Sequence, residues 1–220
     1  MDSLHRICPN LRKISIVASE DLPFRAIRPL LKCLTLVEMI SQEDVDIELE
    51  DMVTITTNRS SWQVIHLPSV KPLSYQAMVP FARNCPHLYK LRLALDSKLG
   101  IPDPNVLDVK FSSLASLIVG FSEPTSDFQL ALFLSKICSK PIEITPYSLI
   151  PENHRLWKTV EKLVNFILTT QLENQRLKDE NIITTHVCRF NVNKTEVMPD
   201  ELSKRIIVPD GDETEEFQSS

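Results

Sequence analysis

Large apolar residues recur along this chain in a short pattern, apolar-x-x-apolar-x-apolar, at intervals that settle at 26 residues. Residues two apart in a strand share a face, so the last two members of each copy point to one side. The first member packs beneath the turn that enters the strand. The copies are Leu11, Ile14 and Ile16; Leu31, Leu34 and Leu36; Trp62, Ile65 and Leu67; Leu88, Leu91 and Leu93; Leu114, Leu117 and Val119; and, in part, Ile142 and Ile144.

Stacking of such units predicts an α/β fold, an irregular leucine-rich-repeat solenoid with a parallel sheet on one face and helices on the other. Parallel strands need crossover connections of a dozen or more residues, and the gaps between copies are long enough. Apolar residues at helical spacing predict helices over 73–83 and 128–137, whereas 43–57 fits a helix or a strand. We expect this array to occupy residues 1–150.

Beyond residue 150 the pattern changes to a single helical period. Apolar residues from Leu156 to Leu172 recur on one side, with charged residues on the other, which predicts an amphipathic helix over 151–182. Such a helix can close the open end of a repeat array, because terminal units need a polar outer face. Binding to a partner helix is the alternative. Residues 183–220 lose periodicity and become acidic, which predicts a disordered tail.

Two copies share more than apolar residues. Cys85 and Pro86 precede one copy at the same offset as Cys8 and Pro9 precede another. A nucleophilic thiol needs a partner such as histidine, and His87 is close to Cys85. Recurrence at one repeat position instead favours packing as small buried side chains.

The composition of the chain argues against several classes of function. The formal net charge of -5 argues against nucleic acid as a partner, since binders usually carry a basic face. Three widely separated glycines exclude a phosphate-binding loop, and the histidines and cysteines lack metal-ligand spacing. We therefore expect no catalytic residue, cofactor or metal. No apolar run could span a membrane, no secretory signal is visible, and the odd cysteine count suits a cytoplasmic or nuclear protein.

Residues 77–93 resemble the leucine-rich repeats of F-box proteins, and more narrowly the F-box-like proteins of mushroom-forming fungi. Four further features match in order, and the resemblance covers roughly residues 5 to 180. They are Phe111-Ser112-Ser113-Leu114 leading to Leu117-Ile118-Val119-Gly120, the turn Ser122-Glu123-Pro124, the segment 130–138, and a terminal helix bearing Trp157 and Val160.

In that family an F-box binds the Skp-type adaptor of a cullin–RING ubiquitin ligase, and the repeats hold the substrate protein. The resemblance therefore implies a substrate-recognition module without enzymatic activity. Met1 stands just before the first copy and no F-box precedes it, so we expect the chain to correspond to the repeat half alone. A stand-alone repeat scaffold is the first alternative. A compact α/β hydrolase is the second, although Gly-x-Ser-x-Gly is missing.

The sheet face opposite the helices is the usual contact surface of such arrays, and its residues alternate with the buried aliphatic ones. Its positive charges suit an acidic or phosphorylated partner segment, although a merely solvated sheet face also needs polar residues. The predicted partner-binding residues are Lys13, Ser15, Thr35, His66, Lys90, Arg92, Ser116 and Glu143, interspersed with Val64 and Ile118.

Overall fold

The computed structural model describes residues 8–17, 22–33, 35–42, 44–57, 59–119, 127–147 and 150–192. Its strands are β1 (Lys13–Ile16), β2 (Leu22–Pro23), β3 (Glu38–Ser41), β4 (Val45–Asp46), β5 (Val64–Leu67), β6 (Lys90–Leu93), β7 (Ser116–Val119) and β8 (Glu143–Pro146). Its α-helices are α2 (Phe24–Ile27), α3 (Leu49–Thr56), α4 (Met78–Asn84), α5 (Asp127–Ile137) and α6 (Pro151–Val192). Short 3-10 helices are η1 (Arg28–Lys32), η2 (Tyr75–Ala77) and η3 (Ser97–Leu99).

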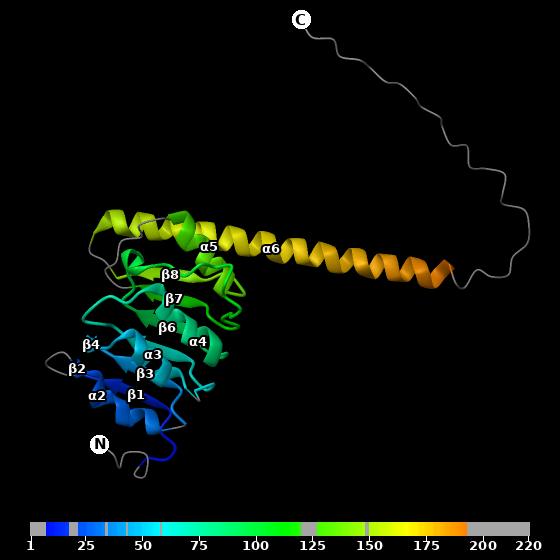
Figure 1. The fold of residues 1–220 in the computed structure, drawn as a ribbon. Helices are drawn as coiled ribbons and strands as arrows, with labels where there is room; N and C mark the ends of the chain where they lie inside the picture. Colours follow the sequence, from blue (N-terminus) through cyan, green and yellow to red (C-terminus); the bar gives the residue numbers. More distant parts are fainter. Residues whose placement is uncertain are drawn as a thin grey trace, which may run out of the picture. The chain divides into compact units, whose positions relative to one another are not determined.

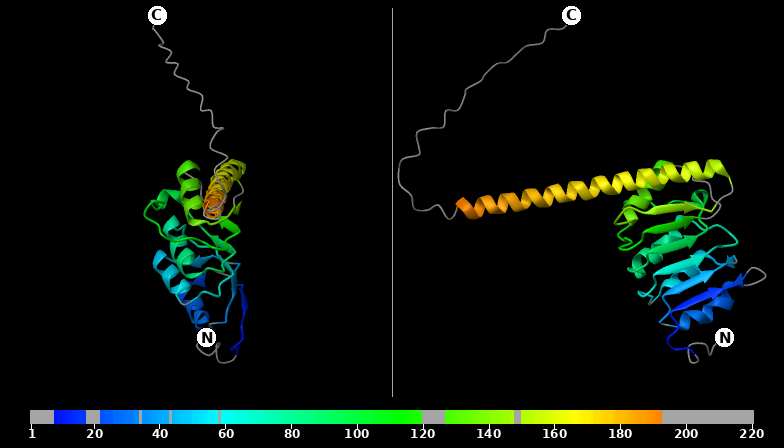
Figure 2. Two further views of the ribbon diagram at one scale, coloured as in Figure 1. Left: turned by 90° about the vertical axis from the view of Figure 1, so that its right-hand side faces the viewer. Right: turned by 180° about the vertical axis from the view of Figure 1, so that it is seen from behind.

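An open parallel sheet of six strands forms the centre of the fold (Figure 1). Its strands follow one another in sequence order, β1-β3-β5-β6-β7-β8, and β2 pairs with β4 in a separate two-stranded sheet. Helices α2, α3, α4 and α5 cover one face of the larger sheet (Figure 2). The prediction of an α/β fold with a parallel sheet and helices on one side is confirmed.

The sheet register aligns one inward residue from each strand. Successive pairs form a row of six aliphatic side chains, separated by 25, 26, 26, 26 and 27 residues, and all but the first are completely buried. The aligned inward positions thus recur at a nearly constant spacing along the chain. The row consists of Ile14, Met39, Ile65, Leu91, Leu117 and Ile144.

The predicted second copy, at Leu31, Leu34 and Leu36, was wrong in register. Leu31 lies in η1, and the strand begins only at Glu38. The aligned copy is instead Leu36, Met39 and Ser41, whose last member is polar although it is buried. The sixth copy is also shifted, because Leu117 pairs with Ile144 and not with Ile142.

The same backbone hydrogen bond closes the turn before four strands of the larger sheet, β1, β3, β5 and β6. The amide of Leu11 donates to the carbonyl of Cys8 at 3.2 Å, and Leu36 and Leu88 repeat this bond to Cys33 and Cys85 at 3.1 Å. Trp62 donates in the same way to Arg59. Cys85 is buried, as predicted, whereas Cys8, for which the same packing role was predicted, is only partly buried. Cys33 and Cys138 are buried as well.

Arg59 occupies the same turn position as these cysteines and is also buried. Its guanidinium donates to the carbonyl of Cys33 at 2.6 Å and lies 5.7 Å from the ring centre of Trp62. The Trp62 indole donates to the carbonyl of Ile55 at 3.1 Å, which ties the turn to helix α3. These polar contacts join neighbouring units inside an otherwise apolar layer.

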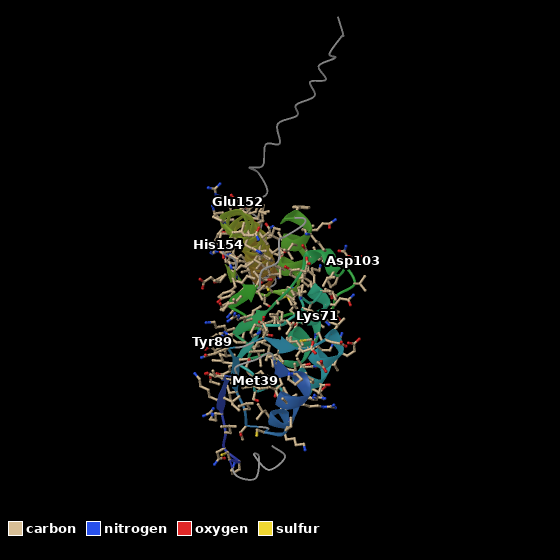
Figure 3. The ribbon with its side chains drawn as sticks, turned by 90° about the vertical axis from the view of Figure 1, so that its left-hand side faces the viewer. Met39, Lys71, Tyr89, Asp103, Glu152 and His154 are labelled. Carbon is tan, nitrogen blue, oxygen red and sulfur yellow. The ribbon has the colours of Figure 1, made fainter. Side chains whose placement is uncertain are left out.

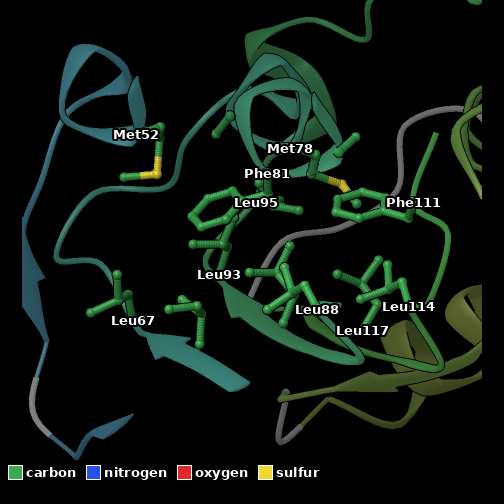
Figure 4. Close-up of a cluster of buried hydrophobic side chains, with 14 of the residues drawn as sticks. Met52, Leu67, Met78, Phe81, Leu88, Leu93, Leu95, Phe111, Leu114 and Leu117 are labelled. Atoms are coloured by element: carbon green, nitrogen blue, oxygen red, sulfur yellow. The ribbon is translucent and has the colours of Figure 1, made fainter. Parts of the chain in front are cut away.

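The core lies between the sheet and the helices (Figure 4). Helix α4 contributes Met78 and Phe81, which meet inward residues of the strands such as Leu93 and Leu117, all of them fully buried. Complete burial of one such side chain stabilises the fold by roughly 1.5–3 kcal/mol. The ambiguous segment 43–57 contains helix α3, whose start is fixed by a capping box between Glu48 and Asp51.

Side chains of α6 complete the outer edge of β8. Asn165 accepts from the amide of Ile142 at 2.9 Å and donates to its carbonyl at 3.0 Å. Glu161 accepts from the amide of Ile144 at 2.6 Å, and Lys158 reaches the carbonyl of Ile144 at 3.4 Å. The next outward position is Pro146, which has no N–H to satisfy. The edge of the sheet is therefore closed by a helix in place of another strand.

The chain divides into two compact units, Met1–Asn174 and Gln175–Ser220, and α6 runs through the boundary. In the first unit its buried residues are Trp157, Val160, Val164 and Leu168. In the second it carries i,i+4 contacts, between Gln175 and Asp179 and between Arg176 and Glu180. The helix extends beyond the predicted 151–182. The remainder of the predicted tail, residues 193–220, lies outside the described residues.

Candidate interaction face

The strand register brings nearly all of the predicted contact residues onto one face of the sheet, opposite the helices. Residues at the first position of each strand form one row, and residues two positions later form a second. The first row is Lys13, Glu38, Val64, Lys90, Ser116 and Glu143. The second row is Ser15, Ile40, His66, Arg92, Ile118 and Thr145. We refer to these two rows as the open face.

Thr35 is not part of the open face, contrary to the prediction. Its hydroxyl donates to the carbonyls of Pro9 and Leu11, at 3.0 and 2.9 Å, in the turn that precedes β3. The error follows from the misplaced second copy. With the strand shifted to Glu38–Ser41, the residues that occupy the face are Glu38 and Ile40, which the apolar pattern did not reveal.

Charges on the open face are unevenly paired. The Lys13 ammonium lies 2.8 Å from the carboxylate of Glu38, and this hydrogen bond and the negative charge of Glu38 raise the pKa of Lys13. Lys90 and Arg92 stand on the central strand β6, two strands from the paired Glu38. The positive character of the face is therefore concentrated at β6.

The guanidinium of Arg92 contacts the aromatic ring of a residue that directly follows β8. Its guanidinium carbon lies 4.6 Å from the ring centre of Tyr147, which follows β8. The register places Ile118 between Arg92 and β8, so the Arg92 side chain extends over β7. Cation–π contact orients the guanidinium, and hydrogen-bonding groups at its edge can still meet a partner.

His66 stands beside Arg92 in the same row, on strand β5. Burial lowers the pKa of His66, and the charges of Lys90 and Arg92 lower it further. The ring is therefore neutral at pH 7. Its Nε2 atom is buried and finds no hydrogen-bond partner within the described parts of the chain.

Aromatic side chains flank the basic centre. Tyr89 and Tyr147 are 45% and 54% exposed, which is high for residues of this size. Tyr89 lies on the sheet side of the molecule, Lys71 and Asp103 lie on the opposite side, and Met39 lies between the layers (Figure 3). Exposed tyrosine next to arginine is a combination that protein interfaces favour.

The cysteine thiols of the helical layer lie in surroundings that do not favour nucleophilic chemistry. Burial raises the pKa of the Cys85 and Cys138 thiols to about 12, the opposite of what a nucleophilic cysteine needs. Within the described ranges, no group of three or more His, Cys, Asp or Glu residues could hold a metal ion. None of the helices described is long and apolar enough to cross a bilayer.

A groove lies on the helical side of the molecule. It is an apolar groove of about 480 Å³ between α3, α4 and the loop that follows η3. Its lining residues are Leu49, Val53, Gln76, Val79, Pro80, Pro102, Asp103, Val106 and Leu107. The sequence pattern did not indicate this groove, because residues 101–107 belong to an irregular loop.

Comparison with known proteins adds no functional assignment: no protein-family model matches this sequence, and no curated protein matches it.

Proposed function

We propose that this chain is a protein-interaction module of the leucine-rich-repeat type, which binds a partner through its open face and performs no chemistry. The repeated turn, the aligned apolar row and the constant unit length support the repeat interpretation. In such arrays the sheet is a rigid support for side chains that project from alternate positions.

The observation that carries the proposal is the group formed by Lys90, Arg92 and Tyr147 at the centre of the open face. Arginine stacked on an aromatic ring loses little side-chain freedom when it binds. Lysine and arginine pair well with carboxylate and phosphate groups. We infer that the partner presents an acidic or phosphorylated segment.

The resemblance to F-box proteins gives this partner a role, as the substrate of a cullin–RING ubiquitin ligase. Copurification with a Skp-type adaptor tests that link separately from the binding face. Retention of a partner without the adaptor would favour the stand-alone scaffold. Retention of both would favour the ligase role.

Charge reversal tests the face itself. The double variant Lys90→Glu/Arg92→Glu should bind the purified partner at least tenfold more weakly than the wild type, because two attractions become repulsions. The matched control is Lys71→Glu/Lys136→Glu, which makes the same charge change on the helical side, where Lys71 and α5 lie. Equal affinities for the two double variants would refute the open face as the binding site.

A further inference from the structure

Strand β1 forms the other end of the sheet and has a neighbour on one side only among the described residues. The carbonyl of Arg12 accepts from the amide of Glu38, and that of Ile16 accepts from Gln42. Backbone groups alternate in direction along a strand. The N–H and C=O groups of Lys13, Ser15 and Val17 therefore point away from β3, toward the open edge.

The outward backbone groups at the two ends of the sheet differ in their hydrogen-bond partners. At β8, the side chains of α6 satisfy the outward backbone groups of Ile142 and Ile144. At β1, the strand pairing within the described ranges is with β3 alone. An edge strand left in this state is a template for another strand.

The apolar layer beneath β1 is also incompletely covered. Ile14 and Ile16 are only partly buried, whereas Leu91 and Leu93, which occupy the same positions of β6, are completely buried. Val17, at the end of the strand, is 67% exposed. One more strand beside β1 would cover these side chains with its own inward residues.

The described segments around β1 carry more cationic than anionic side chains, although Lys13 pairs with the carboxylate of Glu38 on β3. The described segments 8–17 and 22–33 contain five cationic residues and no carboxylate, in a chain whose net charge is -5. Glu20 and Asp21, which fall between these segments in the sequence, lie outside the described residues. The cationic residues are Arg12, Lys13, Arg25, Arg28 and Lys32.

We propose that the backbone edge of β1, beside the Lys13 end of the open face, is a second interaction site, which binds an extended acidic segment of a partner protein as a seventh strand. Backbone groups of Lys13, Ser15 and Val17 would provide the hydrogen bonds. Aliphatic residues at alternate positions of the bound segment would cover Ile14 and Ile16, and its carboxylates would meet the cationic end of the array.

A synthetic peptide of alternating glutamate and valine, acetylated and amidated, tests this with the full chain. Amide exchange measured by NMR should slow at Lys13, Ser15 and Val17 on binding. A peptide with lysine in place of glutamate should bind at least tenfold more weakly. Protection of amides elsewhere but not in β1, or equal binding of the two peptides, would overturn the proposal.

Two variants separate the backbone and charge contributions. Ser15→Pro removes an outward N–H without removing a β1–β3 bond, and should lower peptide affinity at least tenfold, whereas Ser15→Ala keeps the N–H and should bind normally. Arg25→Glu/Arg28→Glu should weaken binding relative to Lys71→Glu/Lys136→Glu, which keeps the test valid if Ser15→Pro fails to fold. Unchanged peptide affinity in both Ser15→Pro and Arg25→Glu/Arg28→Glu would contradict the proposed binding of an acidic strand. So would a dimer of the wild-type chain that Ser15→Pro abolishes, because the strand beside β1 would then come from a second copy.

Discussion

Replacement of Asn165 by leucine should destabilise the first unit markedly, because this one side chain satisfies two backbone groups at the end of the sheet. Its amide oxygen accepts from the N–H of Ile142, and its amide nitrogen donates to the C=O of the same residue. Leucine has a similar volume and no polar atom. Asn165→Leu thus removes both bonds while α6 still covers the strand.

The magnitude follows from the two groups left without partners. Each unsatisfied buried backbone group costs about 1–3 kcal/mol, so the free energy of unfolding should fall by roughly 2–4 kcal/mol, allowing for partial burial. For a unit of this size, such a loss lowers Tm by about 5–12 °C. Urea unfolding followed by tryptophan fluorescence measures it, since Trp157 is buried on the same helix.

The control is Asn174→Leu, the same substitution at an exposed position of α6. It should change stability by no more than about 0.5 kcal/mol. If Asn165→Leu behaved like Asn174→Leu, the edge of β8 would not depend on side-chain hydrogen bonds, and the account of how the sheet ends would be refuted.

Three further predictions concern single residues. Arg59→Ala should cost about 2–4 kcal/mol in urea unfolding, because it leaves a cavity and removes the guanidinium hydrogen bond to the Cys33 carbonyl, which keeps only the bond from the Leu36 amide; a loss below 1 kcal/mol would contradict that role. The lowered pKa of His66 means that the unfolded chain takes up a proton first, so stability should fall as pH drops below about 6.5, and His66→Gln should reduce that slope. Burial of Cys85 should delay the reaction of this residue with a thiol reagent at pH 8 until the protein unfolds, as peptide mass mapping would show; rapid labelling of Cys85 itself in the native protein would show an accessible thiolate.

Most of the parallel strands could be predicted from the sequence, because nearly all of their inward positions are apolar. The failure at the second copy has a specific cause. Leu31, Leu34 and Leu36 imitate the pattern, whereas the true copy ends in Ser41, a polar residue that is nevertheless buried. Register between strands is fixed by turns and hydrogen bonds, which the apolar pattern reports only indirectly.

The residues at the turn position indicate where the strands begin more reliably than the apolar pattern does. Cys8, Cys33, Cys85 and Cys138 mark the same point of successive units, but Arg59 and Phe111 replace cysteine in between. Constant spacing through these replacements would have located the second strand correctly.

Contacts between distant residues were beyond sequence reasoning. Arg92 reaches Tyr147 across an intervening strand, and Asn165 replaces a strand as the hydrogen-bond partner of Ile142. Neither pairing follows from local spacing, because both depend on which side chains the completed sheet and helix bring together. The basic residues of β6 were predicted, but the ring that orients one of them was not.

Site-specific photocrosslinking tests the central claim most directly. A photoreactive phenylalanine derivative placed at Ser116, on the open face, should capture the partner, whereas the same group at Gln76, in the groove on the helical side, should not. Capture at Gln76 without capture at Ser116 would contradict the account and move the binding site to the groove.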